Sequence, residues 1–267
     1  MMHDVFGAPR ALIGMIHVDA LPGTPSSAHA IDVIAARAVA EARVYRDAGF
    51  TALLVENMHD RPYLKRTVGP EIVAGMTRVA TQVRAAVSLP LGVQVLAGAN
   101  REALAVALSC GAAFVRVEGF VFAHVADEGV FEADAGELLR YRRAIGAGHV
   151  RVIADVKKKH AAHAITADVS LIETARAAEF FLADGVVVTG AATGEETDPA
   201  EVTAVEGSVR VPVFVGSGVT ADNLARYPGA AGFIVGSSVK RGGVWHESLD
   251  PARVAAVARA FHAAPAR

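Results

Sequence analysis

Polar and charged residues stand at the ends of short apolar runs along this chain, and these are the side chains that could do chemistry. His17 ends the run 12–17, Glu56 ends the run 52–56, and Glu118 ends the run 114–118, two residues after Arg116. Carboxylates and imidazoles are the usual groups for proton transfer. We therefore expect a candidate catalytic set at the ends of these runs, comprising Asp155, Lys157, Glu56, Glu118, Arg116 and His17.

The segment 154–160 concentrates a carboxylate, three lysines and a histidine, in the order ADVKKKH. Asp155 and Lys157 are two residues apart, so an extended chain places them on one face. We predict that they form the reactive pair, with Lys158 and Lys159 as solvated loop charges. Two routes stay open: a charged Lys157 would stabilise an enolate or enediolate, and a desolvated one would form a Schiff base with a carbonyl substrate.

Arg116 and its neighbours also allow a structural interpretation. A buried charge is costly unless it is paired, so Arg116 needs Glu56, Glu118 or Asp155 as a partner, and these groups could form an ion-pair network that fills one end of the fold. The same carboxylates and His17 could also bind a divalent metal ion. Because the sequence has no fixed-spacing metal motif, it predicts no cofactor and leaves a metal open.

Two glycine-rich turns near the C-terminus resemble a phosphate cradle. Glycines let the backbone approach an oxyanion closely, and exposed N–H groups attract it. A third turn begins at Thr189, and Gln94 is the polar residue of its own run; the alternative is tight-turn packing without a ligand. The predicted substrate-binding residues are Gly216, Ser217, Gly218, Gly236, Ser237, Gln94, Thr189 and Gly190.

The elements that must position these residues alternate along the chain between strand-like and helix-like patterns. Eight near-continuous apolar runs separated by helical patterns predict a single (β/α)₈ barrel with its core at about 11–262, in which the active site lies at the carboxyl ends of the strands. Loops at 21–25 and 57–63 are long enough to be lids. The expected strands are 12–17, 52–56, 91–96, 114–118, 150–156, 186–189, 213–215 and 232–235, and the expected helices are 32–48, 69–87, 101–110, 135–145, 170–183, 199–207, 221–227 and 251–262.

Composition narrows the classes of function. The chain has 267 residues, 52% of them apolar, which supports a sizeable core. A formal net charge of −2 gives no basic excess for nucleic acid. A single cysteine, Cys110, and the lack of a signal-like start or a long apolar stretch predict a cytoplasmic protein without a transmembrane segment. We expect a homo-oligomer.

Several segments together resemble the BtpA family, named after a photosystem I biogenesis protein. They are IHVDALPG at 16–23, EN at 56–57, RVE at 116–118, ADVKKKH at 154–160, VGSGVT at 215–220 and VGSS at 235–238, and the similarity covers about 12–261. The resemblance implies a barrel of the same type and no specific chemistry. Many relatives have Arg-Val-Asn where this chain has Glu118 in third position, which favours a function specific to a subgroup. No Walker-type motif supports a triphosphatase.

Two functions of different class fit these observations. The first is an enzyme acting on a small phosphorylated metabolite, a sugar or nucleoside-derived phosphate, by lyase or isomerase chemistry. The second is a non-enzymatic assembly or biogenesis factor, which should show a large exposed apolar patch. The charged strand ends and the glycine-rich turns favour the enzyme.

Overall fold

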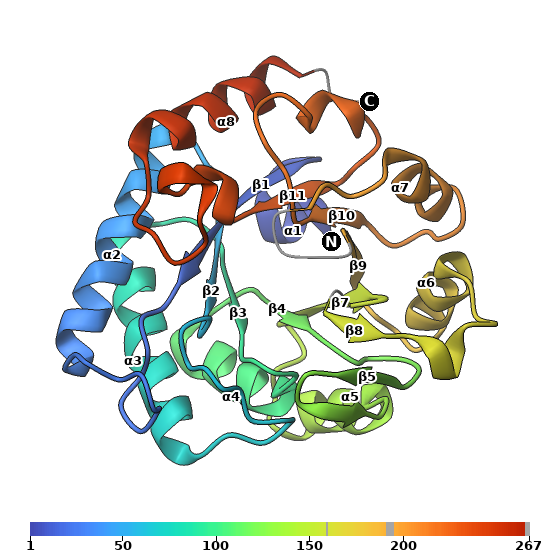
Figure 1. Ribbon diagram of the computed structural model, residues 1–267, viewed down its shortest axis with the longest axis horizontal. Coiled ribbons are helices and arrows are strands. Elements are labelled where there is room, and N and C mark those ends of the chain that lie inside the picture. Colours follow the sequence, from blue (N-terminus) through green and yellow to red (C-terminus); the bar gives the residue numbers. More distant parts are fainter. Residues whose placement is uncertain (159, 191–194, 265–267) are drawn as a thin grey trace.

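The computed structural model describes residues 1–158, 160–190 and 195–264. Eight parallel strands close into a barrel in the order β1-β11-β10-β9-β7-β4-β3-β2 (Figure 1). This confirms the predicted barrel, and the strand bounds fall within two residues of those expected. The barrel strands are β1 Ala11–His17, β2 Ala52–Glu56, β3 Leu91–Gln94, β4 Phe114–Val117, β7 Arg151–Val156, β9 Gly185–Thr189, β10 Val213–Gly216 and β11 Gly232–Val235.

Helices surround the barrel and cover its outer face (Figure 1). They are α2 Ile31–Ala48, α3 Pro70–Ala86, α4 Asn100–Cys110, α5 Ala135–Ala144, α6 Leu171–Phe180, α7 Pro199–Glu206 and α8 Pro251–Ala263. The predicted helix at 221–227 is wrong, because that segment forms only a 3₁₀ turn, Leu224–Arg226. Among the described residues, no helix is long and apolar enough to cross a membrane.

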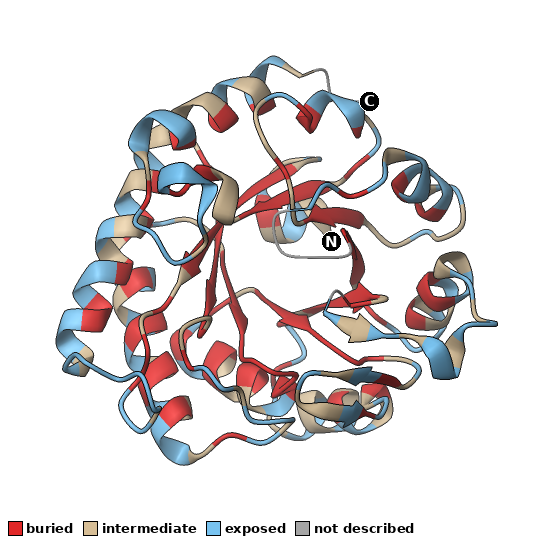
Figure 2. Ribbon diagram, viewed as in Figure 1, coloured by how far each residue is buried: buried red, intermediate tan, exposed pale blue. Residues whose placement is uncertain are grey.

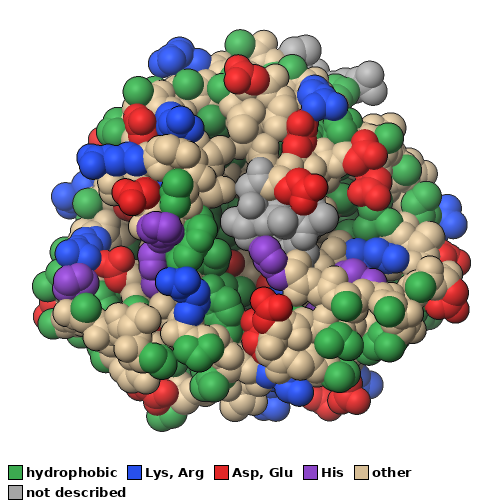
Figure 3. Space-filling model, in the orientation of Figure 1, with side chains coloured by type: hydrophobic (Ala, Val, Ile, Leu, Met, Phe, Trp, Pro, Cys, Tyr) green, Lys and Arg blue, Asp and Glu red, His purple; other side chains and the backbone are tan. Residues whose placement is uncertain are grey.

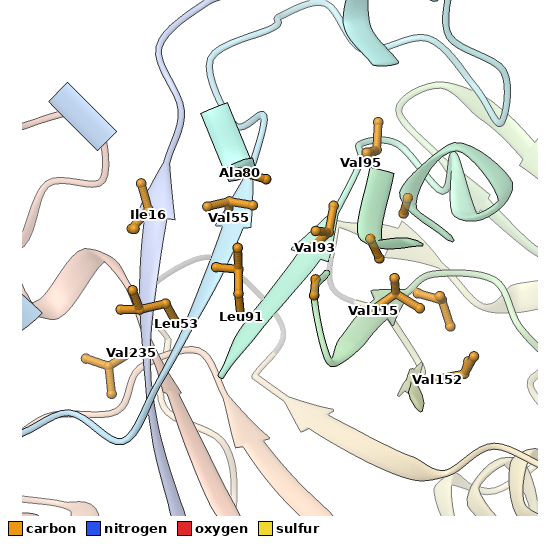
Figure 4. Packing of buried hydrophobic residues seen from close by; sticks show 14 of the residues in the cluster. Ile16, Leu53, Val55, Ala80, Leu91, Val93, Val95, Val115, Val152 and Val235 are labelled. Carbon is orange, nitrogen blue, oxygen red and sulfur yellow. The ribbon is translucent and has the colours of Figure 1, made fainter. Parts of the chain in front are cut away.

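Apolar side chains fill the space between the strands and the helices. Ile16, Val55, Leu91 and Val93 project from their strands into this layer, and Ala80 meets them from α3 (Figure 4). The helices bury one stripe here and expose the opposite face (Figure 2). Strand residues with the other parity therefore face the interior of the barrel.

The barrel interior is closed at its amino-terminal end by aromatic rings. The short helix α1, Met2–Phe6, places Phe6 with its ring centroid 5.4 Å from Phe114 and 5.9 Å from Phe214. Gly92 faces the ring of Phe114, and a side chain there would collide with it. A glycine therefore faces a large ring in this part of the interior. Because the rings close the amino-terminal end, the open end of the barrel lies at the carboxyl ends of the strands.

A small antiparallel sheet that sequence analysis did not predict lies at this open end. It consists of β5 His124–Ala126, β6 Gly129–Phe131 and β8 Ala161–Ala162, in the order β6-β5-β8. The loops after β4 and β7 supply its strands, so it joins two neighbouring barrel units. We call it the cap sheet.

Candidate functional site

A cavity of about 360 Å³ opens at the carboxyl ends of the barrel strands. Figure 3 looks down on this end, where the surface is hollowed and histidine, basic and acidic side chains gather around the hollow. The described residues that line it come from the ends of β1, β2, β3 and β4, from the loops after β2 and β7, from the β5–β6 turn, and from the segments after β10 and β11. We call it the mouth cavity.

His17 and Glu56 end two paired strands and lie side by side on the cavity wall. His17 Nδ1 lies 3.1 Å from the carbonyl oxygen of Trp245, and since a carbonyl can only accept, Nδ1 must carry the proton and donate. Nε2 of His17 then faces Oε2 of Glu56 at 3.7 Å. The two groups are held at a separation that a small reorientation turns into a proton-transfer contact.

Gln94 ends β3 and is only 2% exposed. It shares the inward parity of Gly92, and it lines the mouth cavity. Its side-chain oxygen Oε1 is buried and accepts no hydrogen bond from any residue that the structure describes. A buried acceptor without a donor is rare in folded proteins and marks a position where a ligand hydrogen bond fits.

Arg116 lines the cavity from inside the barrel and is paired with Asp155. Nε and Nη2 of Arg116 donate to the two carboxylate oxygens of Asp155, both at 2.8 Å, and the side chains are 6% and 1% exposed. Burial alone would lower the pKa of Arg116, but Asp155 raises it well above the usual value. Asp155 is thus the partner that Arg116 requires.

The structure corrects the predicted orientation of Lys157. The backbone at Lys157 turns into the left-handed region, with φ of 50°, so the strand alternation ends at Val156. Lys157 lines a separate small space beside Asp155, and Lys158, which was expected to be a solvated charge, lines the mouth cavity and is 9% exposed. Lys159 lies outside the described residues.

Lys158 lies between two carboxylates. Its Nζ is 3.1 Å from Oε2 of Glu118 and 3.9 Å from Oε2 of Glu128, and it lies 5.1 Å from the ring centroid of Phe131. The backbone carbonyl of Glu118 accepts from Asn100 and Arg66, which fixes the end of β4. Glu128 belongs to the β5–β6 turn, so the cap sheet completes this side of the cavity.

The turns after β10 and β11 form the opposite wall through Ser217, Gly218, Gly236 and Ser237. In the described part of the chain, no acceptor pairs with the backbone N–H groups of Gly218, Ser237 and Ser238. The imidazole of His17 lies close to Gly236, so the turn after β11 borders the His17–Glu56 side. These donors are suited to an oxyanion.

The other predicted binding residues lie beside the cavity. Gly216, Thr189 and Gly190 are not among the described residues on its wall, and residues 191–194 of the third turn lie outside the described part. Gly218 packs against the backbone of Glu195, so a side chain there would collide with it. Gly218 is therefore required by packing as well as suited to a ligand.

Sequence reasoning missed the aromatic rim of the cavity. Trp245, in the loop after β11, lies with its ring centroid 4.7 Å from the guanidinium carbon of Arg61 and 5.0 Å from the ring of His59. Tyr63 donates to the carbonyl of Met58, and burial, with the nearby Glu56, raises its pKa. The length of the loop at 57–63 was the available signal for Arg61 and Tyr63, whereas nothing in the sequence marked Trp245.

Metal ligation was left open by the sequence. In the ranges that the structure describes, no group of three or more histidine, cysteine, aspartate or glutamate residues is arranged to hold a metal ion.

Comparison with known sequences gives a match across the chain. The model of the BtpA family matches residues 8–263. An uncharacterized protein of Caenorhabditis elegans, named as mitochondrial, is 46% identical over 95% of this chain and 94% of its own length. The photosystem I biogenesis protein BtpA of Synechocystis is 34% identical over 97% of this chain and 91% of its own.

Solved structures share the fold at low identity. Orotidine 5'-monophosphate decarboxylase from Methanocaldococcus jannaschii has a TM-score of 0.60 at 12% identity, covering 95% of this chain and 99% of its own. Geranylgeranylglyceryl phosphate synthase from Thermoplasma acidophilum, in complex with sn-glycerol-1-phosphate, has a TM-score of 0.58 at 12% identity, covering 97% and 96%. At these identities, the likeness concerns the barrel alone.

Proposed function

The chain belongs to the BtpA family, and from this premise we propose that it is an enzyme acting on a small phosphorylated metabolite. The metabolite binds in the mouth cavity and reacts by proton transfer, in a lyase or isomerase reaction. One observation carries the proposal: two acid–base pairs line the same cavity as a set of N–H donors that have no acceptor among the described residues.

The phosphate binds at the turns after β10 and β11. The N–H groups of Gly218, Ser237 and Ser238 supply donors, and Ser237 adds its hydroxyl group to the same wall. Barrel enzymes frequently bind phosphate with the loops after the seventh and eighth strands, which here are β10 and β11. The names of the two structural neighbours specify phosphorylated compounds, which supports a phosphorylated ligand by analogy of fold.

The reacting end of the metabolite extends toward β1, β2 and β4. The Glu56–His17 pair and the Glu118–Lys158 pair supply carboxylates, an imidazole and an ammonium group on the cavity wall. One carboxylate removes a proton next to a carbonyl, and the charged groups across the cavity stabilise the resulting enolate or enediolate. Arg116 and Asp155 hold the floor of the site through their bidentate ion pair.

The test is calorimetric titration with inorganic phosphate and a panel of sugar and nucleotide phosphates. Ser237→Asp places a negative charge at the turn and should weaken every phosphorylated ligand by at least about tenfold. The matched control is Ser88→Asp, an exposed serine after α3 at the other end of the barrel, which should leave affinity unchanged. If no phosphorylated compound binds, or if both variants bind as the unsubstituted protein does, the proposal fails.

An assembly role is the second candidate. It is supported by an exposed apolar segment at the end of α6, where Phe180, Phe181 and Leu182 are 81%, 47% and 69% exposed, and by the name of the Synechocystis relative. This role predicts that Phe180→Ser with Leu182→Ser removes cellular function while Ser237→Asp preserves it. The enzyme proposal predicts the reverse.

The cellular location, the oligomeric state and the metal requirement are proposals as well. A cytoplasmic setting suits the buried free thiol of Cys110. Light scattering tests the expected homo-oligomer. Titration with Mg²⁺ in the presence of a bound phosphate ester tests whether a divalent metal takes part.

A further inference from the structure

Three buried acceptor atoms on the wall of the mouth cavity accept no hydrogen bond from the residues that the structure describes, although one of them belongs to an ion pair. They are Oε1 of Gln94, Oε2 of Glu118 and Oε2 of Glu128. The three residues come from β3, from the end of β4 and from the β5–β6 turn, so separate elements bring them to one place. An amide oxygen and an ionised carboxylate oxygen can accept hydrogen bonds but cannot donate them.

Two of the three acceptor atoms belong to carboxylates, and one ammonium group lies near both of them. Nζ of Lys158 is the ammonium that lies near both carboxylates, at 3.1 Å from Glu118 and 3.9 Å from Glu128. Contact at 3.1 Å brings Glu118 and Lys158 into an ion pair, yet Oε2 of Glu118 still lacks hydrogen-bond geometry. Two carboxylates therefore share one ammonium in the described part of this wall.

Gln94 is an uncharged acceptor, so its lack of a described donor does not depend on the charges of the two carboxylates. Its side chain is neutral, 2% exposed and carried by a barrel strand with inward parity. Buried polar groups are normally satisfied, so a buried acceptor without a donor calls for a specific explanation, and a bound ligand group is the one proposed here. On the opposite wall, the turns after β10 and β11 offer backbone N–H donors that have no acceptor among the described residues.

We propose that the ligand is bipolar: an oxyanion at one end, and at the other a group rich in hydrogen-bond donors, which Gln94, Glu118 and Glu128 receive. Hydroxyl and amino groups share this chemistry, and because two carboxylates share one ammonium, an amino group binds more tightly than a hydroxyl. The inference rests on the proposed function for the position of the phosphate, and it narrows the substrate class to phosphorylated amino or polyhydroxy compounds.

Two matched sets of probes test this inference by calorimetry. The first is 2-aminoethyl phosphate, 2-hydroxyethyl phosphate and ethyl phosphate, and the second is glucosamine 6-phosphate, glucose 6-phosphate and 2-deoxyglucose 6-phosphate. Within a set, one position changes from amino to hydroxyl to hydrogen. We expect the amino and hydroxyl members of at least one set to bind roughly tenfold or more tightly than the member with hydrogen, with the amino member first.

Substitutions at the acceptor residues test whether this preference arises in the mouth cavity. Gln94→Leu and Glu128→Gln should each reduce the difference within a set to less than about threefold, while the affinity for inorganic phosphate stays unchanged. The matched control is Gln82→Leu on α3, which should preserve the preference.

The outcomes separate this inference from the proposed function. If inorganic phosphate binds and the members of both sets bind equally, or if the preference survives Gln94→Leu, the inference is overturned and the phosphate site stands. If no phosphate compound binds, the proposed function fails, and ethanolamine and glucosamine are then titrated without phosphate. Binding that Gln94→Leu abolishes would support the donor-rich end alone, and no binding would overturn it too.

Discussion

At the scale of single residues, strand alternation explains which side chains reach the mouth cavity and where that reasoning ends. The residues at the strand ends were expected to form the candidate catalytic and binding set, and His17, Glu56, Gln94 and Arg116 of that set line the cavity. The alternation holds because the residues of a strand are extended with a period of two. At Lys157 the backbone leaves the extended region, and no sequence pattern signals that a lysine in this segment adopts a positive φ.

A pair of lysine variants measures this difference. Once a substrate is identified, Lys158→Met should lower kcat by roughly 10²-fold or more, the usual scale for a group that stabilises charge or transfers a proton. Lys157→Met should lower it by less than about threefold, because Lys157 lines a separate space. Equal losses in both variants would contradict the assignment. Borohydride trapping with the substrate adds a second readout, since only an imine intermediate leaves a covalent adduct on Lys158.

The ion pair of Arg116 and Asp155 predicts a large effect on stability. Asp155→Asn leaves the guanidinium buried without a charged partner, and removal of one member of such a pair costs about 3–5 kcal/mol. Denaturant unfolding measures this loss. The control is Asp32→Asn, which breaks the exposed pair with Arg78 and should cost less than about 1 kcal/mol. A loss below about 1 kcal/mol for Asp155→Asn would show that the pair contributes little to folding.

At the scale of elements, the barrel was predictable and the cap sheet was not. The barrel strands are apolar because they are buried on both faces, and the helices between them have a clear polar side. The cap strands β5, β6 and β8 are two or three residues long and alternate weakly, so no period can be read from them. Because Glu128 lies in the β5–β6 turn and Lys158 lies shortly before β8, part of the candidate site depends on an element without a sequence signal.

His124 gives the cap sheet a predicted response to acid. Burial, followed by the nearby Lys158, lowers the pKa of His124 to about 4. The unfolded chain, with a pKa of about 6.5, binds the proton more tightly between these values. The contribution of His124 is therefore complete above about pH 6.5 and is lost as the pH falls toward 4. Asp134 acts in the opposite direction, since burial raises its pKa to about 6.

The comparison of His124→Gln with the unsubstituted protein isolates this group. Unfolding free energies from urea titrations at pH 7 and pH 4.5 should fall less in the variant, by a difference on the order of 1–2 kcal/mol. His149→Gln, on the surface before β7, is the control and should fall as the unsubstituted protein does. An identical pH dependence in His124→Gln would refute the prediction.

At the scale of the whole molecule, the two ends of the barrel have different tasks. The amino-terminal end is closed by Phe6 against Phe114 and Phe214, and the carboxyl-terminal end is open and charged. The apolar interior of the barrel separates these two ends. Barrels of this fold generally carry the active site at the carboxyl-terminal end and stabilising residues at the other. The likeness of this chain to structures only 12% identical reflects the shared barrel fold.

Phe6→Ala should separate stability from binding. Loss of the buried ring leaves a cavity and costs about 3–5 kcal/mol in denaturant unfolding. Ligand affinity at the mouth cavity should change by less than about twofold at a temperature where the variant stays folded, because the opposite end of the barrel is untouched. A matched decrease in affinity would show that the two ends are coupled. Val5→Ala in the same helix, which is only partly buried, is the milder control.

The position of Trp245 makes the mouth cavity its own optical reporter. It is the one tryptophan in the sequence, and it lies at the rim against Arg61 and His59 while its carbonyl oxygen holds His17. Indole fluorescence of this protein therefore arises from a single known place, and quenching or a spectral shift on mixing with a compound reports on that rim. Ligand screening and stopped-flow association rates follow without any label.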